Sequence, residues 1–174
     1  MIRSRKISEI ATVDEYREYF KINENWMLEW IKPKGPTKAG KVVEYSSKGY
    51  YIVTFKRKTY LVHRVIWALH YGEHPPSDKE IDHIDGNPSN NNIANLRLCN
   101  RQQNTRNRSS NKVATSKFKG VNYDSTRKKW YASGCDASGK YKSLGRHNTE
   151  IEAALAFNEF AKKEHGEFAR LNQV

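Results

Sequence analysis

The sequence predicts an α+β protein built from two modules, residues 1–107 and 117–174, joined by a basic linker at 108–116. Three observations lead to this prediction. Short strand-like runs alternate with segments of helical periodicity in the first module. The stretch at 108–116 is polar and has little hydrophobic periodicity, which is typical of a linker. After it, three strand-like runs precede one helix, a pattern that favours a three-stranded antiparallel sheet packed on that helix.

The first module is predicted to open with a helix, because Thr12 and Glu15 form a capping-box pattern and the helix extends to about Lys21. The strand-like runs that follow are WMLEWI at 26–31, VVEY at 42–45, GYYIVTF at 49–55 and, after the turn KRKT, YLVH at 60–63. The segment 63–71 places apolar residues at helical spacing, and Gly72 is a typical helix stop.

A hairpin followed by a helix is predicted next. EIDHI at 80–84 and NLRLC at 95–99 are strand-like, and DGNPSNNN between them is dense turn chemistry. Asn100 can cap a helix that continues through NRQQNTRNR.

In the second module, the runs FKGVNY, KKWYASGC and KYKSLGR are strand-like, and D-A-S-G at 136–139 is a hairpin turn. Thr149 starts a helix with Glu152 at the capping-box position. Strand alternation predicts that Trp130, Ala132 and Leu144 face this helix. The opposite face then presents Lys129, Tyr131, Ser133, Tyr141 and Ser143, and Lys119, Asn122 and Arg127 are expected to join it.

The chain is strongly basic and very polar. Its net charge is +12 over 174 residues, its pI is near 9.7 and 37% of its residues are hydrophobic. Such a charge favours nucleic acid as the partner. Between Asn100 and Lys129 nine Lys or Arg residues accompany one acid, Asp124, so this strip is the best candidate for phosphate contacts. A solvated flexible linker would have the same composition.

The two cysteines and the short apolar runs argue against a disulfide-rich, secreted or membrane-spanning protein. Cys99 and Cys135 form neither a CxxC pair nor a disulfide framework, which fits a reducing cytoplasm. No apolar run approaches membrane-spanning length, and the N-terminus lacks the apolar segment of a secretion signal. We therefore expect a cytoplasmic protein that is not secreted and has no membrane partner.

Glu80 to Asn104 gathers the residue types that phosphodiester hydrolysis needs. His83 can activate a water, because the pKa of a histidine lies near operating pH. Asp82 offers a hard oxygen ligand, and Asn104 can add an amide oxygen from the following helix. Such a set suits Mg²⁺ and suits zinc poorly. A calcium loop is disfavoured because Ile84 interrupts the alternating ligands.

The adjacency of Asp82 and His83 poses a geometric question. In a regular strand their side chains would point to opposite faces. They can serve one phosphate if the strand bends or ends there, or if they act from opposite sides of it.

The segments LVHRVIWALHYGEHPP and IDHIDGNPSNNNIANLRLCNRQQN resemble the HNH homing-endonuclease family of the phage and intron type, over about Thr12 to Asn107. The resemblance implies a ββα-metal nuclease fold. His83 would be the general base, Asp82 and Asn104 would bind a single Mg²⁺ or Mn²⁺, and Asn95 would brace the hairpin loop. Asn104 stands where other members have histidine. The upstream pair His63–Arg64 would support the site or contact phosphate.

Residues 116–172 resemble the plant ethylene-response-factor (APETALA-type) DNA-binding domain, through Lys119–Val121, Lys129–Trp130, Ser143–Gly145, Ala153–Ala156 and Ala169–Asn172. In that family the sheet enters the major groove. The plant domains carry more arginines and another tryptophan on this face, so base preference does not transfer. The candidate DNA-binding residues of the whole chain are His63, Arg64, Arg101, Arg106, Arg108, Lys112, Lys117, Lys119, Asn122, Arg127, Lys129, Tyr131, Ser133, Tyr141 and Ser143.

Together these resemblances imply a site-specific, homing-type endonuclease for double-stranded DNA, encoded by a phage and acting in the bacterial cytoplasm, with no small-molecule substrate. One active site per chain favours a monomer that nicks. A DNA-binding regulator with a degenerate HNH module is the alternative, and a plasmid-nicking assay separates the two. An RNA-binding protein would fit the charge but not the motif.

Overall fold

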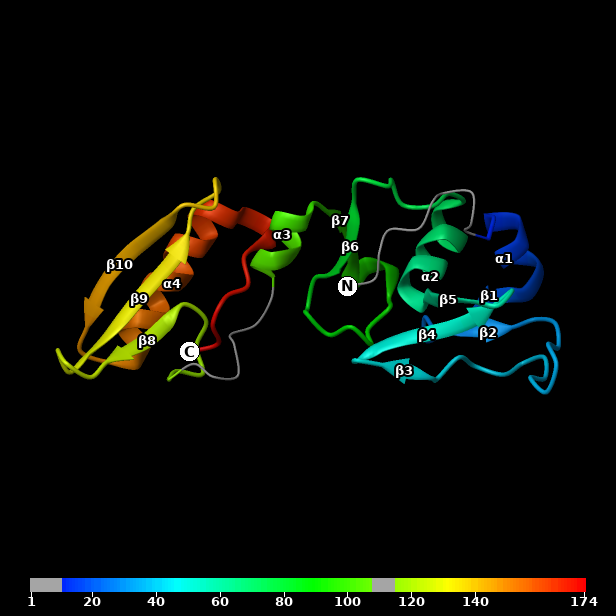
Figure 1. Cartoon of the computed structure of the whole chain (residues 1–174), viewed down its shortest axis with the longest axis horizontal. Helices are drawn as coiled ribbons and strands as arrows, with labels where there is room; N and C mark the ends of the chain where they lie inside the picture. The colour runs from blue at the N-terminus through cyan, green and yellow to red at the C-terminus, as the bar shows by residue number, and fades with distance from the viewer. Residues whose placement is uncertain (1–10, 108–114) are drawn as a thin grey trace. The chain divides into compact units, whose positions relative to one another are not determined.

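The computed structural model describes residues 11–107 and 115–174. The chain divides into two compact units, Met1–Leu98 and Cys99–Val174, which Figure 1 shows with their helices and strands labelled. Each unit is described by itself below.

The first unit begins with α1 (Val13–Tyr19), and Thr12 and Glu15 form the predicted capping box. The helix ends two residues before the predicted Lys21, because the chain turns extended at Phe20 and enters β1 (Phe20–Ile22). This strand pairs antiparallel with β2 (Leu28–Trp30).

A second sheet has the order β3-β4-β5, with β3 at Ser46–Ser47, β4 at Tyr50–Phe55 and β5 at Lys58–Leu61. Its β4–β5 hairpin turns at Lys56 and Arg57, which both have positive φ (48° and 61°), as a two-residue turn requires. The predicted strand at 42–45 is wrong: within it the structure has one isolated bridge, from Val42 to Glu29.

Helix α2 (Val62–Tyr71) follows and ends at Gly72, whose left-handed φ of 78° and N–H bond to Ala68 close the helix as the sequence predicts. Its buried face packs into an aromatic core that includes Phe20, Trp30 and Phe55. The rings of Phe20 and Trp30 lie 4.4 Å apart. This core makes α2 a fixed support for the next hairpin.

That hairpin consists of β6 (Glu80–His83), a short 3₁₀ turn η2 (Ile93–Asn95) and β7 (Leu96–Cys99). Ile81 and Leu96 form a small apolar cluster with Trp67 of α2. Burial of these side chains fixes the hairpin against the helix. The predicted strands at 80–84 and 95–99 are therefore present, each shorter by one residue.

The second unit contains α3 (Arg101–Arg106), the strands β8 (Val121–Asp124), β9 (Lys129–Cys135) and β10 (Tyr141–His147), α4 (Glu150–His165) and the turn η3 (Gly166–Phe168). The sheet is antiparallel in the order β10-β9-β8. The predicted caps are present: Asn100 with Gln103 on α3, and Thr149 with Glu152 on α4.

Small residues let α4 pack closely on this sheet. Ala132 on β9 and Ala153 and Ala154 on α4 are fully buried in one cluster, and Trp130 and Leu144 pack against it, as alternation predicts. Gly120 permits the closest approach, because a Cβ built there would lie 2.1 Å from the ring of Phe157.

The boundary between the compact units lies at Leu98–Cys99, before α3, whereas the sequence places the linker at 108–116. Helix α3 is part of the second unit, and within that unit Gln102 Nε2 donates to the Ala137 carbonyl at 3.1 Å. Residues 108–114 lie outside the described part of the chain, so the linker itself stays a prediction. Over residues 11–107 and 115–174, no helix has the length and hydropathy needed to cross a membrane.

Candidate active site

Asp82 and His83 stand at the end of β6, where the strand gives way to a turn closed by a bond from Gly86 N–H to the His83 carbonyl (2.8 Å). Both side chains are buried, with 5% and 6% of their surfaces exposed. The strand ends at this pair, which is one of the two routes expected for adjacent residues to serve one phosphate. Each side chain has its own set of partners.

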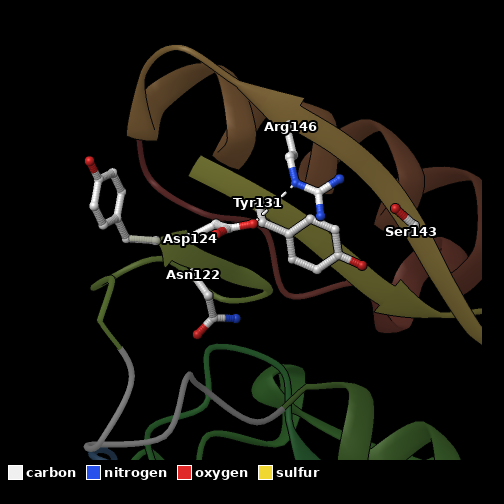
Figure 2. Close-up of a pocket in the computed structure, with 6 residues that line it drawn as sticks. Asn122, Asp124, Tyr131, Ser143 and Arg146 are labelled. Carbon is white, nitrogen blue, oxygen red and sulfur yellow. Dashed lines mark hydrogen bonds and ion pairs between the residues drawn. The ribbon is translucent and has the colours of Figure 1, made fainter. Parts of the chain in front are cut away.

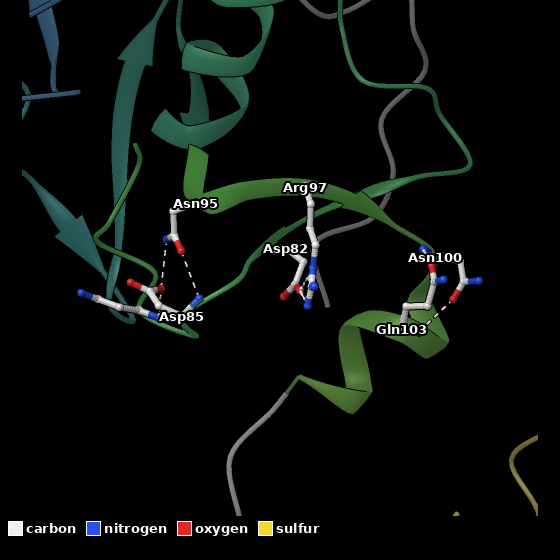
Figure 3. A network of polar contacts seen from close by, with 7 residues as sticks. Asp82, Asp85, Asn95, Arg97, Asn100 and Gln103 are labelled. Carbon is white, nitrogen blue, oxygen red and sulfur yellow. Dashed lines mark hydrogen bonds and ion pairs between the residues drawn. The ribbon is translucent and has the colours of Figure 1, made fainter. Parts of the chain in front are cut away.

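Asp82 forms a buried ion pair with Arg97 on β7. The Arg97 Nε and Nη2 groups donate to the same carboxylate oxygen, Oδ2, at 3.0 and 2.9 Å (Figure 3). Sequence reasoning missed Arg97. The hairpin register contains the signal, since the bond from Ile84 N–H to the Asn95 carbonyl brings Arg97 to the level of Asp82.

His83 is enclosed by side chains from three different elements. Its Nε2 lies 3.1 Å from Asn91 Oδ1 in the loop after β6. The ring of His63 on α2 meets it edge to face, with centroids 5.0 Å apart, and the ring of Tyr50 on β4 is 6.0 Å away. Neither Asn91 nor Tyr50 could be predicted from the sequence, because no local pattern marks these contacts.

His63 is itself buried, and burial, with His83 and Arg64 nearby, lowers its pKa to about 3. It is therefore neutral at physiological pH. This position fits the supporting role expected for His63 rather than a phosphate contact. Arg64 is half-buried, and burial lowers its pKa although Tyr16 and Glu80 raise it.

Asn95 ties the loop together. Its Nδ2 donates to Asp85 Oδ1 (3.0 Å) and to the Asn90 carbonyl (2.9 Å), and its Oδ1 accepts from the Asp85 N–H (3.0 Å; Figure 3). Burial raises the pKa of Asp85, but hydrogen bonds from Asn90, Asn87 and Asn95 outweigh it and hold that pKa below its usual range. The ionised Asp85 carboxylate therefore accepts the hydrogen bonds that hold the loop together.

Asn104 lies on α3, one turn after the Asn100 cap, and its N–H donates to the Asn100 carbonyl at 3.0 Å. The helix belongs to the second compact unit, so the predicted ligand role of Asn104 rests on its place in the motif. Arg101 is exposed on the same helix, and Arg106 is its last residue.

Comparison with known proteins adds to this geometry. Residues 60–106 match the family model described as HNH endonuclease, a span that contains α2, the hairpin and α3. Protein 3.8 of Escherichia phage T7 is 33% identical over 108 residues, which cover 62% of this chain and 87% of that protein. Residues 60–106 are therefore an HNH endonuclease domain. An uncharacterised HNH endonuclease of Acanthamoeba polyphaga mimivirus is 35% identical over 132 residues, 75% of this chain and 66% of that protein.

The second unit of this HNH protein presents a polar hollow of about 390 Å³ on the outer face of its sheet (Figure 2). Its lining combines amide, hydroxyl, carboxylate and guanidinium groups from all three strands: Asn122, Tyr123, Asp124, Tyr131, Ser143 and Arg146. Three of these residues, Asn122, Tyr131 and Ser143, belong to the predicted DNA-binding face.

Arg146 was missed because β10 contains a bulge. Ser143 pairs with Ser133 and Arg146 pairs with Tyr131, so three steps on β10 match two on β9. The extra residue, at Gly145 with φ of 100°, turns Arg146 outward, although strict alternation points it toward the helix. Its guanidinium carbon lies 5.5 Å from the Tyr131 ring centroid, and its Nε donates to Asp124 Oδ2 at 3.3 Å.

The other predicted DNA contacts are placed as follows. Lys117, Arg127 and Lys129 are exposed, Tyr131 and Tyr141 share a hydrogen bond between their hydroxyls, and Ser133 is half-buried. Lys119 is half-buried, and burial, with Arg170 nearby, lowers its pKa to about 8. Arg108 and Lys112 lie outside the described residues. Residues 117–174 lie outside the family-model match, so the plant-type resemblance stays a prediction.

Proposed function

We propose that this HNH protein is a site-specific, homing-type endonuclease that hydrolyses phosphodiester bonds of double-stranded DNA, with His83 as general base and one divalent cation. The observation that carries the proposal is the buried pair Asp82–His83 at the end of β6. Arg97 is the partner of Asp82, and Asn91 is the partner of His83. Fixed geometry of this kind is what a catalytic pair needs.

His83 would remove the proton from the attacking water, and its neutral neighbour His63 adds no opposing charge beside it. The buried setting keeps the imidazole in one orientation. Asn95 and Asp85 would hold the loop that carries this arrangement.

The residue types of the predicted donor set suit a hard cation. Asp82 is a carboxylate fixed by β6 and Arg97, and Asn104 would add an amide oxygen. Within the described ranges no group of three or more His, Cys, Asp or Glu side chains is clustered to hold a metal, so a cation here would rely on few protein oxygens, as Mg²⁺ does. When bound, the cation neutralises charge on the phosphate and the leaving oxygen.

Removal of the metal tests this proposal. Supercoiled plasmids carrying phage genomic fragments should be cut in Mg²⁺ or Mn²⁺, not cut in excess EDTA, and cut again when the cation is restored. Mapping the ends on both strands would distinguish the nick that we propose for a monomer from a double-strand break. Undiminished cutting in excess chelator would contradict the metal assignment. Absence of cutting with every divalent cation would contradict the proposed nuclease activity.

The second unit would add affinity and sequence preference through the outer face of its sheet. Arg146 is the best-placed base reader on that face, because the Tyr131 ring and Asp124 orient its guanidinium before DNA arrives. Residues Asn122 and Ser143 beside it offer further hydrogen-bonding groups.

Arg146→Ala should weaken binding of the cleaved duplex by about 10-fold or more, since a bidentate arginine–guanine contact contributes roughly 1–3 kcal/mol. Binding to unrelated duplex should change much less. The matched control is Lys163→Ala on α4, an exposed cation whose removal changes the net charge equally. Fluorescence anisotropy measures the affinity of each variant for the cognate and for the unrelated duplex. If Arg146→Ala and Lys163→Ala lose affinity for the cognate duplex equally, Arg146 contributes only non-specific charge.

A further inference from the structure

Asn91 has an unusual hydrogen-bonding state in the loop between β6 and η2. It is 3% exposed, and its Oδ1 lies 3.1 Å from His83 Nε2. Its Nδ2 is buried with no hydrogen-bond partner, which is true of no other buried side-chain nitrogen or oxygen in the described part of the chain. A buried donor without a partner destabilises a fold, so such groups require an explanation.

Bracing of the loop does not explain it. Neighbouring asparagines use their side chains within the loop: Asn90 donates to Asp85 at 2.8 Å, and Asn92 accepts from the Ala94 N–H at 3.0 Å. Asn95 makes the three bonds described above. The side chain of Asn91 instead contacts the imidazole of His83 and leaves its own amide nitrogen unpaired.

The identity of the contacting atom determines which ring nitrogen is basic. When Oδ1 faces Nε2, the imidazole must carry its proton on Nε2, and Nδ1 of the neutral ring is then the nitrogen that accepts a proton. If the amide were rotated, Nδ2 would donate to Nε2 and the proton would sit on Nδ1. Neither ring nitrogen could then act as a base. General-base chemistry at His83 therefore requires the carbonyl orientation.

We propose that Asn91 is the positioning residue of His83, fixing the Nε2–H tautomer and the ring orientation so that Nδ1 receives the proton of the attacking water. The proposal rests on the proposed nuclease function and adds a residue to its mechanism. His63 and Tyr50, packed against the same ring, limit its rotation from the other elements.

Asn91→Leu tests this with a side chain of similar size. It removes the unpaired donor but also the acceptor of the His83 Nε2–H, and these two effects on stability oppose each other, so the melting temperature should change little. At the same time kcat for plasmid cleavage should fall by about 10- to 100-fold, the range found when a residue that orients a metal-ligating imidazole is lost. KM for DNA should not change, because the side chain is buried. Asn91→Asp retains the acceptor and should recover most of the lost kcat.

The matched control is Asn92→Ala, which removes the η2 cap in the same loop without touching His83. It should lower stability and leave kcat unchanged for the folded fraction. Wild-type kcat in Asn91→Leu, a rise in KM alone, or a folded Asn91→Asp as slow as Asn91→Leu would each overturn the proposal. If the wild-type protein cuts no DNA, the proposed function fails instead.

Discussion

Replacing His83 with alanine is expected to lower DNA cleavage by about 10²- to 10⁴-fold, the usual contribution of a general base, while duplex binding is retained. The binding should survive because the imidazole is buried among Asn91, His63 and Tyr50, and Ala removes little of the exposed surface. Nicking of supercoiled plasmid under single-turnover conditions, beside anisotropy on the same DNA, measures the two effects separately.

A second histidine provides the control for this experiment. His70 lies on the exposed side of α2, so His70→Ala removes the same chemical group away from the site. Its cleavage rate should equal that of the wild type. Cleavage by His83→Ala at the wild-type rate would exclude His83 as the base. Binding without cleavage by the wild-type protein itself would favour the alternative of a DNA-binding regulator.

Replacing Arg97 with methionine is expected to destabilise the protein by about 3–5 kcal/mol in EDTA, because it removes the guanidinium that neutralises a buried carboxylate. The side chains of Arg97 and Asp82 are only 12% and 6% exposed, so water cannot substitute for the lost charge. The double variant Asp82→Asn with Arg97→Met should recover much of this loss, since neither charge then remains buried. Urea unfolding followed by tryptophan fluorescence measures all three proteins.

An exposed ion pair gives the comparison. Lys32 and Glu18 are paired at 2.8 Å with about half of each side chain exposed, and Lys32→Met should cost about 1 kcal/mol or less. If Arg97→Met costs no more than Lys32→Met, the Asp82–Arg97 pair does not stabilise the hairpin.

The features that the sequence predicted correctly depend on short-range chemistry. The caps at Thr12, Asn100 and Thr149 each require two residues three positions apart, and all three form capping boxes in the structure. The hairpin before α3 and the three strands of the second unit are bounded by turn residues that act locally. Gly72 stops α2 for the same reason.

What the sequence did not predict depends on contacts between distant segments. Residues 42–45 have strand composition, but they form only one bridge, at Val42. Val43 and Tyr45 make single backbone bonds to Leu28 and Ile52, which belong to two different strands, so no continuous ladder forms. Tyr50 and His63 approach His83 from other elements, over 20 or more positions of sequence. Arg146 faces outward because of a bulge in β10, and regular strand alternation does not predict where a bulge occurs.

The contact of Tyr50 with the His83 imidazole also shows which segments of the chain surround the candidate active site. The family match starts at residue 60, yet one wall around His83 is supplied by β4, upstream of that point. Residues 60–106 alone therefore lack one of the side chains that surround His83. A chimaera that transplants the cutting activity into another protein has to carry the β4–β5 hairpin with it, and its junction belongs before Ser46 rather than at Tyr60.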